Sequence, residues 1–504
     1  MSAMSLKRPS VKSQSGFLLV TAIFLLVILA ALGAFILTIS GTQQTSSALD
    51  VQGTRAYQAA RAGIEWASYQ VINAGGCTGY LYERSVTINH LKVPNTDQNN
   101  FPVLFSGTYA GGGGSLDLRT VGNGGKVTSA SGFDIIFTDS AGTKLDHEIE
   151  SYSAMTGAVN FWVRVPTVSY TTDTVIYLCY GNSSITTSQE NKTGVWNSNF
   201  KMVQHLQETS GTHLDSTSNA NNSSVIAVTT QGSATGKING TDAFTAASLN
   251  HIDVGNNAMF DVSTSESMTV EAWVKTAGTG SYEFVVNRKT DANSGWQLHI
   301  NGSNPEFWFY DDTPGTPGHK AFANSVTAVN NNAFHYLVAR WTAGTKTAEV
   351  FIDGASAASG TAGSIGAVSN TRPLRIGEEG DTNGGFDFDG IIDEVRFSKT
   401  ALSNDWILTS YNSMNSPSTF YTLGNEGAPG TSYATDCNPG PTTQNVTGMG
   451  GSLSGFTATV TCSSTTYTEG GATVTVYQIT STGATGTVGT LDRVERQLQA
   501  TLNK

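Results

Sequence analysis

The apolar run Phe17–Ser40, FLLVTAIFLLVILAALGAFILTIS, constrains this chain most, because it contains no charged residue. About 20 apolar residues suffice for a helix to cross a bilayer. The basic residues Lys7, Arg8 and Lys12 precede the run, without any acidic residue among them. This charge pattern predicts a cytoplasmic N-terminus and export of everything that follows the run. The bulk of the 504 residues is therefore expected outside the cytoplasm.

The helix is predicted to continue beyond the membrane, because residues 41–73 contain no proline. Small residues recur there at helical spacing, and they are Ala48, Val51, Ala59, Ala62, Ala67 and Val71. One helix from Phe17 to about Ile72 would be roughly 80 Å long at 1.5 Å per residue. We expect residues 17–76 to form this long spine.

A Gly-Phe pair stands before the apolar run, at Gly16 and Phe17. An ordinary secretory signal has its small-residue cleavage site after the apolar stretch instead. A basic leader over residues 1–16 that ends in glycine resembles the class III leader of type IV pilins and pseudopilins. The resemblance implies that a prepilin peptidase cleaves after Gly16 and that the new amine of Phe17 is modified by methylation. A plain single-span anchor is the alternative interpretation.

Two further segments resemble MshP-like minor pilins of the mannose-sensitive haemagglutinin (MSHA) pilus system. They are TRAYQAARAGIEWASYQ (Thr54–Gln70) and the stretch Ser454–Ala500. Residues 429–504 also read as a small antiparallel β-meander, since apolar residues alternate with threonines there. The resemblance implies a single-pass inner-membrane protein with a periplasmic bulk, which later joins a pilus at the cell surface. Its partners would be other pilin subunits and the pilus assembly machinery.

One residue departs from the pattern of major pilins. Most pilins carry a glutamate at the fifth mature position, which pairs with the N-terminal amine of a neighbouring subunit. Here that position is Thr21. Either the subunit occupies a tip or initiator position, or a neutral spine is tolerated.

The segment between the two pilin-like stretches resembles an insertion into a loop of the host domain. Its first part, residues 77–193, resembles a β-sandwich domain of unknown function that often precedes laminin-G-like domains in bacterial surface proteins. This part holds a group of acidic residues and a histidine, which we expect on solvated strand edges and turns. They are Asp134, Asp139, Asp146, His147, Glu148 and Glu150.

Residues 194–428 carry alternating strands such as SMTVEAWVK and PEFWFY, separated by Gly, Asn and Asp turns. They resemble the laminin-G-like branch of the concanavalin-type jelly rolls, which implies binding of a carbohydrate or a protein. Asp215 and Asp393 look like the acids that hold a calcium ion in such domains. Core packing is the expected role of most of the tryptophans Trp273, Trp296, Trp308 and Trp341.

Concanavalin-type folds also include glycosidases, which use paired carboxylates. Their strand motif resembles E-x-D-x-E, whereas this chain has DFDGIIDE, with other residue types and spacing. We expect no enzyme.

Four cysteines fit no metal-binding spacing and suit an oxidising envelope compartment. The predicted disulfide joins Cys437 to Cys462, which leaves Cys179 as a buried free thiol. Cys77 could compete for either partner.

The formal charge of −12 excludes a nucleic-acid surface, and 13% charged residues with 55 glycines favour turn-rich β-structure. The predicted fold is mainly β with one long N-terminal helix, a small pilin-like sheet, an inserted β-sandwich and a concanavalin-like jelly roll. The predicted function is a minor pilin-like subunit that displays a laminin-G-like module for adhesion to a glycan or protein. A structural spacer or pilus-initiation subunit is the alternative, and a glycoside hydrolase is a more distant one.

Overall fold

The computed structural model describes residues 17–72, 77, 79–112, 115–289, 294–311, 319–379, 386–427, 442–469, 472–486 and 493–503. They form a mostly β protein with one long N-terminal helix, which confirms the predicted fold class. The chain divides into two compact units. Met1–Ala74 and Thr431–Lys504 make up the first, here called the helix unit, and Gly75–Gly430 makes up the second, here called the insert unit.

Helix α1 (Phe17–Ile72) runs for 56 residues without a break, as predicted. Among the described residues, it is the one helix long and apolar enough to cross a membrane. Its apolar side chains there are widely exposed, with Leu26 at 68% and Leu29 at 62%. Apolar surface of this extent requires a cover of lipid or of other helices.

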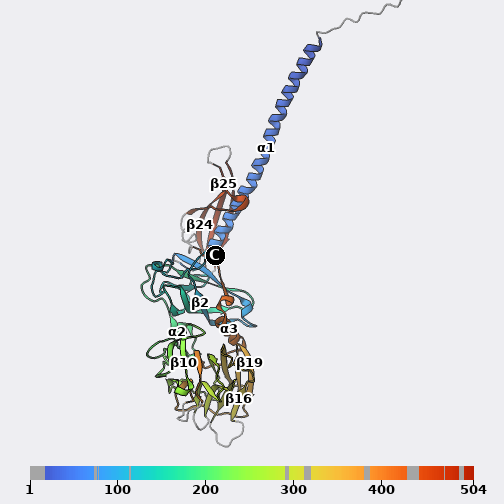
Figure 1. Cartoon of the computed structure of the whole chain (residues 1–504). Coiled ribbons are helices and arrows are strands. Elements are labelled where there is room, and N and C mark those ends of the chain that lie inside the picture. The colour runs from blue at the N-terminus through green and yellow to red at the C-terminus, as the bar shows by residue number, and fades with distance from the viewer. Residues whose placement is uncertain are drawn as a thin grey trace, which may run out of the picture. The chain divides into compact units, whose positions relative to one another are not determined.

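A four-stranded antiparallel sheet packs on the C-terminal half of α1 (Figure 1). Its strands follow in chain order: β23 (Thr442–Val446), β24 (Thr457–Glu469), β25 (Ala472–Thr485) and β26 (Val494–Asn503). On β24 the alternate residues Ala458, Val460 and Cys462 are fully buried, as their spacing predicted. Ala67 of α1 packs against the last two of them.

Glycine allows the helix and the sheet to approach closely at Gly63. A Cβ atom at this position would lie 2.2 Å from Ser481 Oγ and 3.0 Å from Ala458 Cβ. Gly483 of β25 allows the same close approach from the sheet, because a Cβ atom at this position would lie 2.1 Å from the carbonyl oxygen of Ala56. Side chains of the sheet at Gly63 and the helix backbone at Gly483 thus leave no room for a Cβ atom at either position.

The insert unit begins with a β-sandwich, here called the first sandwich, which has two antiparallel sheets. One sheet has the strand order β22-β1-β6-β3 and the other has the order β2-β5-β4. The bounds are β1 (Tyr82–Ile88), β2 (Gln98–Thr108), β3 (Ile136–Thr138), β4 (His147–Tyr152), β5 (Ala158–Val168), β6 (Thr174–Tyr180) and β22 (Tyr421–Leu423). Its core includes Phe105, Phe137, Phe161 and Leu178.

Strand β22 comes from the far end of the insert. It pairs antiparallel with β1, with Val86 opposite Leu423. The first sandwich is therefore completed only after the chain has passed through the second one. The expected division at residues 77–193 and 194–428 did not anticipate this return, because a three-residue strand carries no periodic signal.

A disulfide joins Cys77 to Cys179 of β6, with their Cα atoms 5.3 Å apart. The prediction that Cys179 is a free thiol was therefore wrong. The apolar YLCYG strand showed correctly that this residue is buried, but burial does not exclude a partner that arrives from the start of the insert. Cys462 is also disulfide-bonded, and its predicted partner, Cys437, lies outside the described residues.

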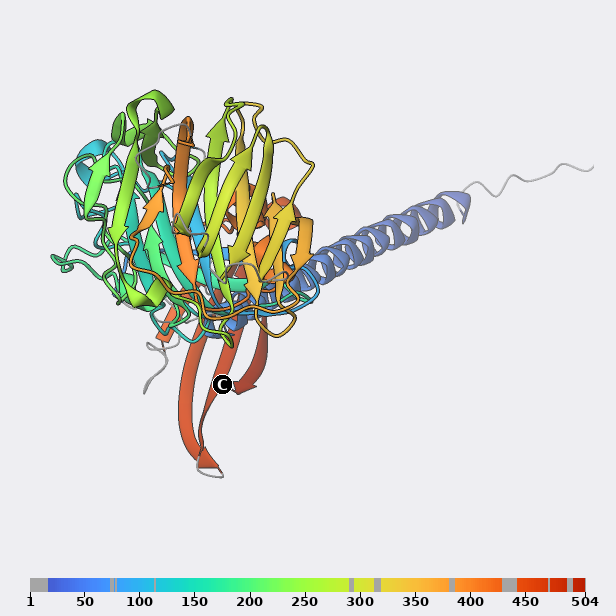
Figure 2. The ribbon, with the colours of Figure 1, turned by 90° about the horizontal axis from the view of Figure 1, so that it is seen from below.

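The second sandwich also has two antiparallel sheets, whose strands run alongside one another in Figure 2. The first, here called the inner sheet, has the order β19-β18-β17-β12-β21-β10-β9, and β7 also pairs with β21. Its strands are β7 (Phe200–Gln204), β9 (Thr230–Thr235), β10 (Gly240–Phe244), β12 (Met268–Thr276), β17 (Phe334–Thr342), β18 (Thr347–Ile352), β19 (Ala355–Thr361) and β21 (Gly390–Ser398).

The other sheet, here called the outer sheet, has the order β16-β15-β14-β13-β20-β11-β8. Its strands are β8 (Val225–Ala227), β11 (His251–Gly255), β13 (Glu283–Lys289), β14 (Gly295–Asn301), β15 (Asn304–Tyr310), β16 (Lys320–Asn324) and β20 (Leu374–Ile376). Trp296 and Trp341 lie in the core between the two sheets.

The two sandwiches share a second apolar cluster, here called the junction. It contains Trp162 of the first sandwich and Trp273, Tyr336 and Val338 of the inner sheet. Helices α2 (Lys192–Val195) and α3 (Asn404–Asn415) contribute Val195, Ile407 and Met414, and the short helix α4 (Pro417–Phe420) leads back to β22. The face of the inner sheet that points away from its own core is thus buried.

Substitution of Gly63 tests the close contact in the helix unit. Gly63→Ala should destabilise the packing of β24 and β25 on α1 by about 1–3 kcal/mol, because the added methyl group overpacks the contact. This loss should exceed the gain of about 1 kcal/mol in helix propensity. Gly41→Ala is the control, since its Cβ would meet nothing within 4 Å. Hydrogen exchange of the β24 and β25 amides measures the effect, and unchanged exchange in Gly63→Ala would contradict the packing.

Candidate functional site

The structure assigns different places to the four tryptophans of the second sandwich. Trp273, Trp296 and Trp341 are buried, at 1% exposure or less, which confirms core packing for three of them. Trp308 is half-buried, on the face of the outer sheet that points away from the core. It is the one tryptophan of the four that a ligand can reach.

A hollow of about 170 Å³ adjoins Trp308, and we call it the aromatic hollow. Its lining combines aromatic rings with a few polar groups. The lining residues are Tyr282, Phe284, Lys289, Gln297, Trp308, Tyr310, Glu379 and Phe386.

Strand alternation explains why these residues share one face. On β15, Phe307 and Phe309 point into the core, so Trp308 and Tyr310 point out. On β14, Trp296 and Leu298 lie in the core, and Gln297 lines the hollow. The outward positions of two adjacent strands thus form the floor of the hollow.

The rings around Trp308 hold its position. Its ring centroid lies 4.6 Å from that of Phe322 and 5.6 Å from that of Tyr282. Its indole Nε1–H donates to Asn324 Oδ1 at 2.9 Å. Tyr282 has a φ of 59°, a left-handed conformation that is rare for a bulky side chain. Backbone strain of this kind is often retained at binding sites.

The polar groups of the hollow are also fixed. Tyr310 donates to Gln297 Oε1 at 2.5 Å. Burial raises the pKa of Tyr310, so its hydroxyl stays protonated. Lys289 pairs with Oε1 of Glu379, and Oε2 of Glu379 is a buried acceptor that has no hydrogen-bond partner among the described residues. An aromatic floor with a few oriented polar groups is the usual composition of a small-molecule site.

The junction holds a second group of functional side chains. Glu148 and Glu150 of β4 point away from the core of the first sandwich and are 4% and 6% exposed. Both were expected at solvated positions, and this expectation was wrong. The two residues share the outward face of the strand, but this face meets the inner sheet of the second sandwich instead of water.

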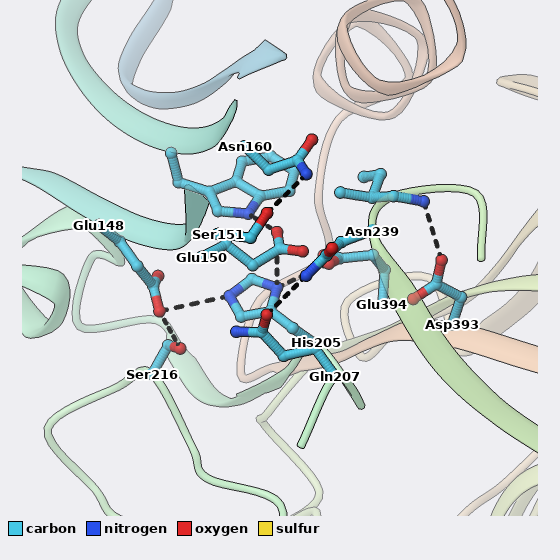
Figure 3. A network of polar contacts seen from close by, with 12 residues as sticks. Glu148, Glu150, Ser151, Asn160, His205, Gln207, Ser216, Asn239, Asp393 and Glu394 are labelled. Atoms are coloured by element: carbon cyan, nitrogen blue, oxygen red, sulfur yellow. Dashed lines mark hydrogen bonds and ion pairs between the residues drawn. The ribbon is translucent and has the colours of Figure 1, made fainter. Parts of the chain in front are cut away.

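His205, directly after β7, lies between these acids and β21. Figure 3 shows its ring between Glu148 on one side and Glu150 and Glu394 on the other. Its Nδ1 lies 2.6 Å from Glu394 Oε1 and 3.6 Å from Glu150 Oε2, and its Nε2 lies 3.4 Å from Glu148 Oε1. Burial raises the pKa of Glu150 to about 8. Sequence reasoning missed His205, because no motif in the sequence points to it.

A β-bulge brings Glu394 into this group. Trp273 pairs with Asp393 and Glu271 pairs with Arg396, so β21 has one extra residue between these pairs. Glu394 has a φ of 54° there. Such a bulge re-aims side chains, and two consecutive acids, Asp393 and Glu394, are both turned away from the core.

The carboxylates predicted to hold calcium, Asp215 and Asp393, have other partners. Asp215 accepts hydrogen bonds from the amides of Val203, Thr217 and Asn221 and from the Thr217 hydroxyl, at 2.8–2.9 Å. Asp393 Oδ2 accepts from the amides of Lys237 and Ile238.

These hydrogen bonds occupy the lone pairs of Asp215 that a calcium ion would use. The prediction of calcium at Asp215 and Asp393 gains no support from these contacts and stays a prediction. Of the described residues, Glu150, His205 and Glu394 instead form a group that could hold a metal ion. At the processing site, Phe17 is the first residue of α1, and Gly16 lies outside the described residues.

This fold defines a class of β-sandwich protein in which a concanavalin A-like module follows an apolar N-terminal helix along the chain. Residues 247–408 match the Concanavalin A-like lectin/glucanases superfamily. Residues 131–222 match a domain of unknown function, DUF2341. No curated protein matches the chain significantly.

Several solved structures are similar to parts of this chain. The binding domain of Paraclostridial Mosquitocidal Protein 1 is 12% identical, with a TM-score of 0.36, over 58% of this chain and 72% of that one. Domain 4 of AbnA, a GH43 extracellular arabinanase from Geobacillus stearothermophilus solved with arabinotriose, is 18% identical, with a TM-score of 0.33, over 42% and 98%. The CBM40 of Ruminococcus gnavus IT-sialidase, bound to alpha2,3 sialyllactose, is 15% identical, with a TM-score of 0.26, over 32% and 95%.

Removal of the Asp215 carboxylate tests whether it organises its loop by hydrogen bonds alone. Asp215→Ala should lower the free energy of unfolding by about 2–4 kcal/mol, because it leaves buried donors without an acceptor. Calcium added to the chelator-treated wild type should leave its free energy of unfolding unchanged. The control, Asp97→Ala, removes an exposed carboxylate that accepts one hydrogen bond from the Tyr170 amide. Urea unfolding of the wild type and both variants measures these effects. If a chelator destabilises the wild type and calcium restores its stability, calcium binding at Asp215 would be favoured instead.

Proposed function

We propose that this chain is a minor pilin-like subunit that displays a glycan-binding module. The aromatic hollow is the main evidence for glycan binding. A sugar ring presents C–H groups on its faces, which pack on an aromatic side chain such as Trp308, and hydroxyl groups at its edge. Gln297, Tyr310 and Glu379 lie around the hollow and offer partners for those hydroxyl groups. At about 170 Å³ the hollow is smaller than a typical small-molecule pocket of about 300–1,000 Å³, so it suits one sugar unit of a longer glycan.

The form of the helix unit supports the pilin-like part. An exposed apolar helix half continues without a break into a half that carries a four-stranded sheet. In a fibre, the apolar halves of neighbouring subunits would cover one another, and before assembly lipid would cover them. The basic leader and the Gly16–Phe17 pair agree with assembly into a fibre. The partners are then the prepilin peptidase, the assembly machinery and other pilin subunits.

The placement of the hollow also favours binding over a spacer. A spacer needs only length and stability, so it has no use for an accessible tryptophan or a strained Tyr282. The spacer stays an alternative outcome of the tests below. A concanavalin-type glycosidase needs a pair of catalytic carboxylates across a bound sugar. Among the described residues, the hollow has one carboxylate in its lining, Glu379, and this group is already paired with Lys289. The lining of the hollow therefore does not favour a glycosidase.

The binding part is tested by Trp308→Ala. A printed glycan array identifies the best glycan for the purified wild type, and calorimetry then compares the variants. We expect Trp308→Ala to weaken binding at least about tenfold, since 1.4 kcal/mol is a factor of ten in affinity. Tyr170→Ala is the control, because Tyr170 is an aromatic residue 43% exposed on the first sandwich. Equal affinity of both variants would reject the hollow as the site.

The pilin-like part is tested by deletion of the whole insert unit. Ala74 is joined to Thr431, which removes Cys77 and Cys179 together and leaves no unpaired member of their disulfide. We expect the shortened protein to enter fibres, to begin at Phe17 by intact mass, and to lose adherence. A chain that retains Met1 would reject the pilin interpretation, and unchanged fibres and adherence would favour the spacer.

A further inference from the structure

We propose that Glu150, His205 and Glu394 form a binding site for a divalent transition-metal ion at the junction. Glu150 belongs to the first sandwich, and His205 and Glu394 belong to the second. An ion held by all three would therefore join the two sandwiches. This site is separate from the aromatic hollow and does not depend on the proposed glycan binding.

The ligand atoms of the three residues are already close. One atom from each residue lies within 4.8 Å of the other two, and all three residues are buried. His205 Nδ1 and Glu394 Oε1 are 2.6 Å apart. Without a metal, a proton bridges these two atoms, and a metal ion would take the place of that proton.

Glu150 supplies an independent indication of a ligand. Its Oε2 lies 3.6 Å from His205 Nδ1 and accepts a hydrogen bond from Trp162 Nε1 at 2.8 Å. Its Oε1 is buried and has no hydrogen-bond partner among the described residues. A buried carboxylate oxygen without a partner is costly, and a metal ion on this carboxylate would remove that cost.

Each of the three side chains also has the kind of outer partner that orients metal ligands. Arg396 Nη2 donates to Glu394 Oε2 at 2.6 Å and leaves Oε1 on the side of His205. The guanidinium of Arg396 is itself held over the ring of Trp162, 4.4 Å from its centroid. The second ring nitrogen of His205 faces Glu148 Oε1 at 3.4 Å, as a carboxylate faces a metal-bound imidazole. Glu148 is fixed in turn by Ser216 and by Trp196.

The charged groups of the junction also favour a bound cation. Buried carboxyl groups outnumber cationic groups in this region: Glu148, Glu150, Glu271, Asp393 and Glu394 are buried there, with Arg396 and His205 as the buried cationic side chains. Buried charges without partners are destabilising. A divalent cation would supply positive charge where the acids converge.

The donor set determines the class of metal. Imidazole with two carboxylates suits zinc, manganese or iron, whereas calcium prefers oxygen ligands alone. The junction site thus differs from the calcium site predicted at Asp215 and Asp393 in position and in chemistry.

The test uses the full chain, purified in detergent and stripped with a strong chelator. Elemental analysis before stripping, and calorimetric titration with zinc(II) or manganese(II) after it, measure binding. We expect about one ion per chain and a higher unfolding temperature with the ion, because binding stabilises the folded form. Glu150→Gln and His205→Gln should each weaken the affinity at least about tenfold.

His213→Gln is the matched control. His213 is also buried between two carboxylates, Glu208 and Asp242, each at 2.8 Å, but they contact opposite ring nitrogens. One ion cannot bind between them, so this variant should keep wild-type affinity. Absence of binding to the folded wild type, a response to calcium alone, or wild-type affinity in both ligand variants would each overturn the proposal. The wild-type titration decides even if a variant fails to fold.

Discussion

Where the two sandwiches of the insert unit meet, each presents a sheet face that a lone sandwich would leave in water. Both faces are buried instead, and they carry charges as well as tryptophans. Arg396 of β21 stacks over Trp162 of the first sandwich, and His205 pairs with Glu148 and Glu150 of β4, so these contacts tie the second sandwich to the first. Removal of one partner from a buried pair costs far more than an exposed pair contributes. The insert unit is for this reason a single body rather than two domains on a linker.

This burial also determines which surface remains for a ligand. The inner sheet is covered by its own core on one face and by the junction on the other. The outward face of the outer sheet is covered neither by the core nor by the junction, and Trp308, Tyr282 and Phe322 gather there. The proposed binding surface is thus a consequence of the domain order, because a concanavalin-like sandwich by itself would expose both outward faces.

The sequence predicted what depends on local periodicity. The uncharged run and the missing proline predicted α1, and alternation predicted the strands of the meander and of the second sandwich. The same period of two places Glu148 and Glu150 on one face of β4. It did not show what that face meets, since periodicity carries no information about a partner distant in the sequence.

The same limit explains the other failures. The Cys77–Cys179 bridge, the return of β22 and the place of His205 all depend on contacts between segments far apart in the chain. The bulge at Glu394 turns two consecutive acids to one side, against the strict alternation that sequence reasoning assumes. Of the hollow, only Trp308 was named beforehand, among four tryptophans that the sequence alone does not distinguish.

The pairing of β1 with β22 has a mechanical consequence. The chain enters and leaves the insert unit through these two neighbouring strands, and a bridge between Glu83 and Gly427 extends their pairing. A pull on the second sandwich is therefore shared between two parallel tethers, so neither strand bears the whole tension. The Cys77–Cys179 bridge anchors the first tether to β6 by a covalent bond. The second tether has no covalent anchor in the first sandwich: it is held by the hydrogen bonds of β22 to β1 and by Glu426, which pairs with Lys126 and accepts a hydrogen bond from Tyr180. Under traction the two tethers are thus secured by bonds of different kinds.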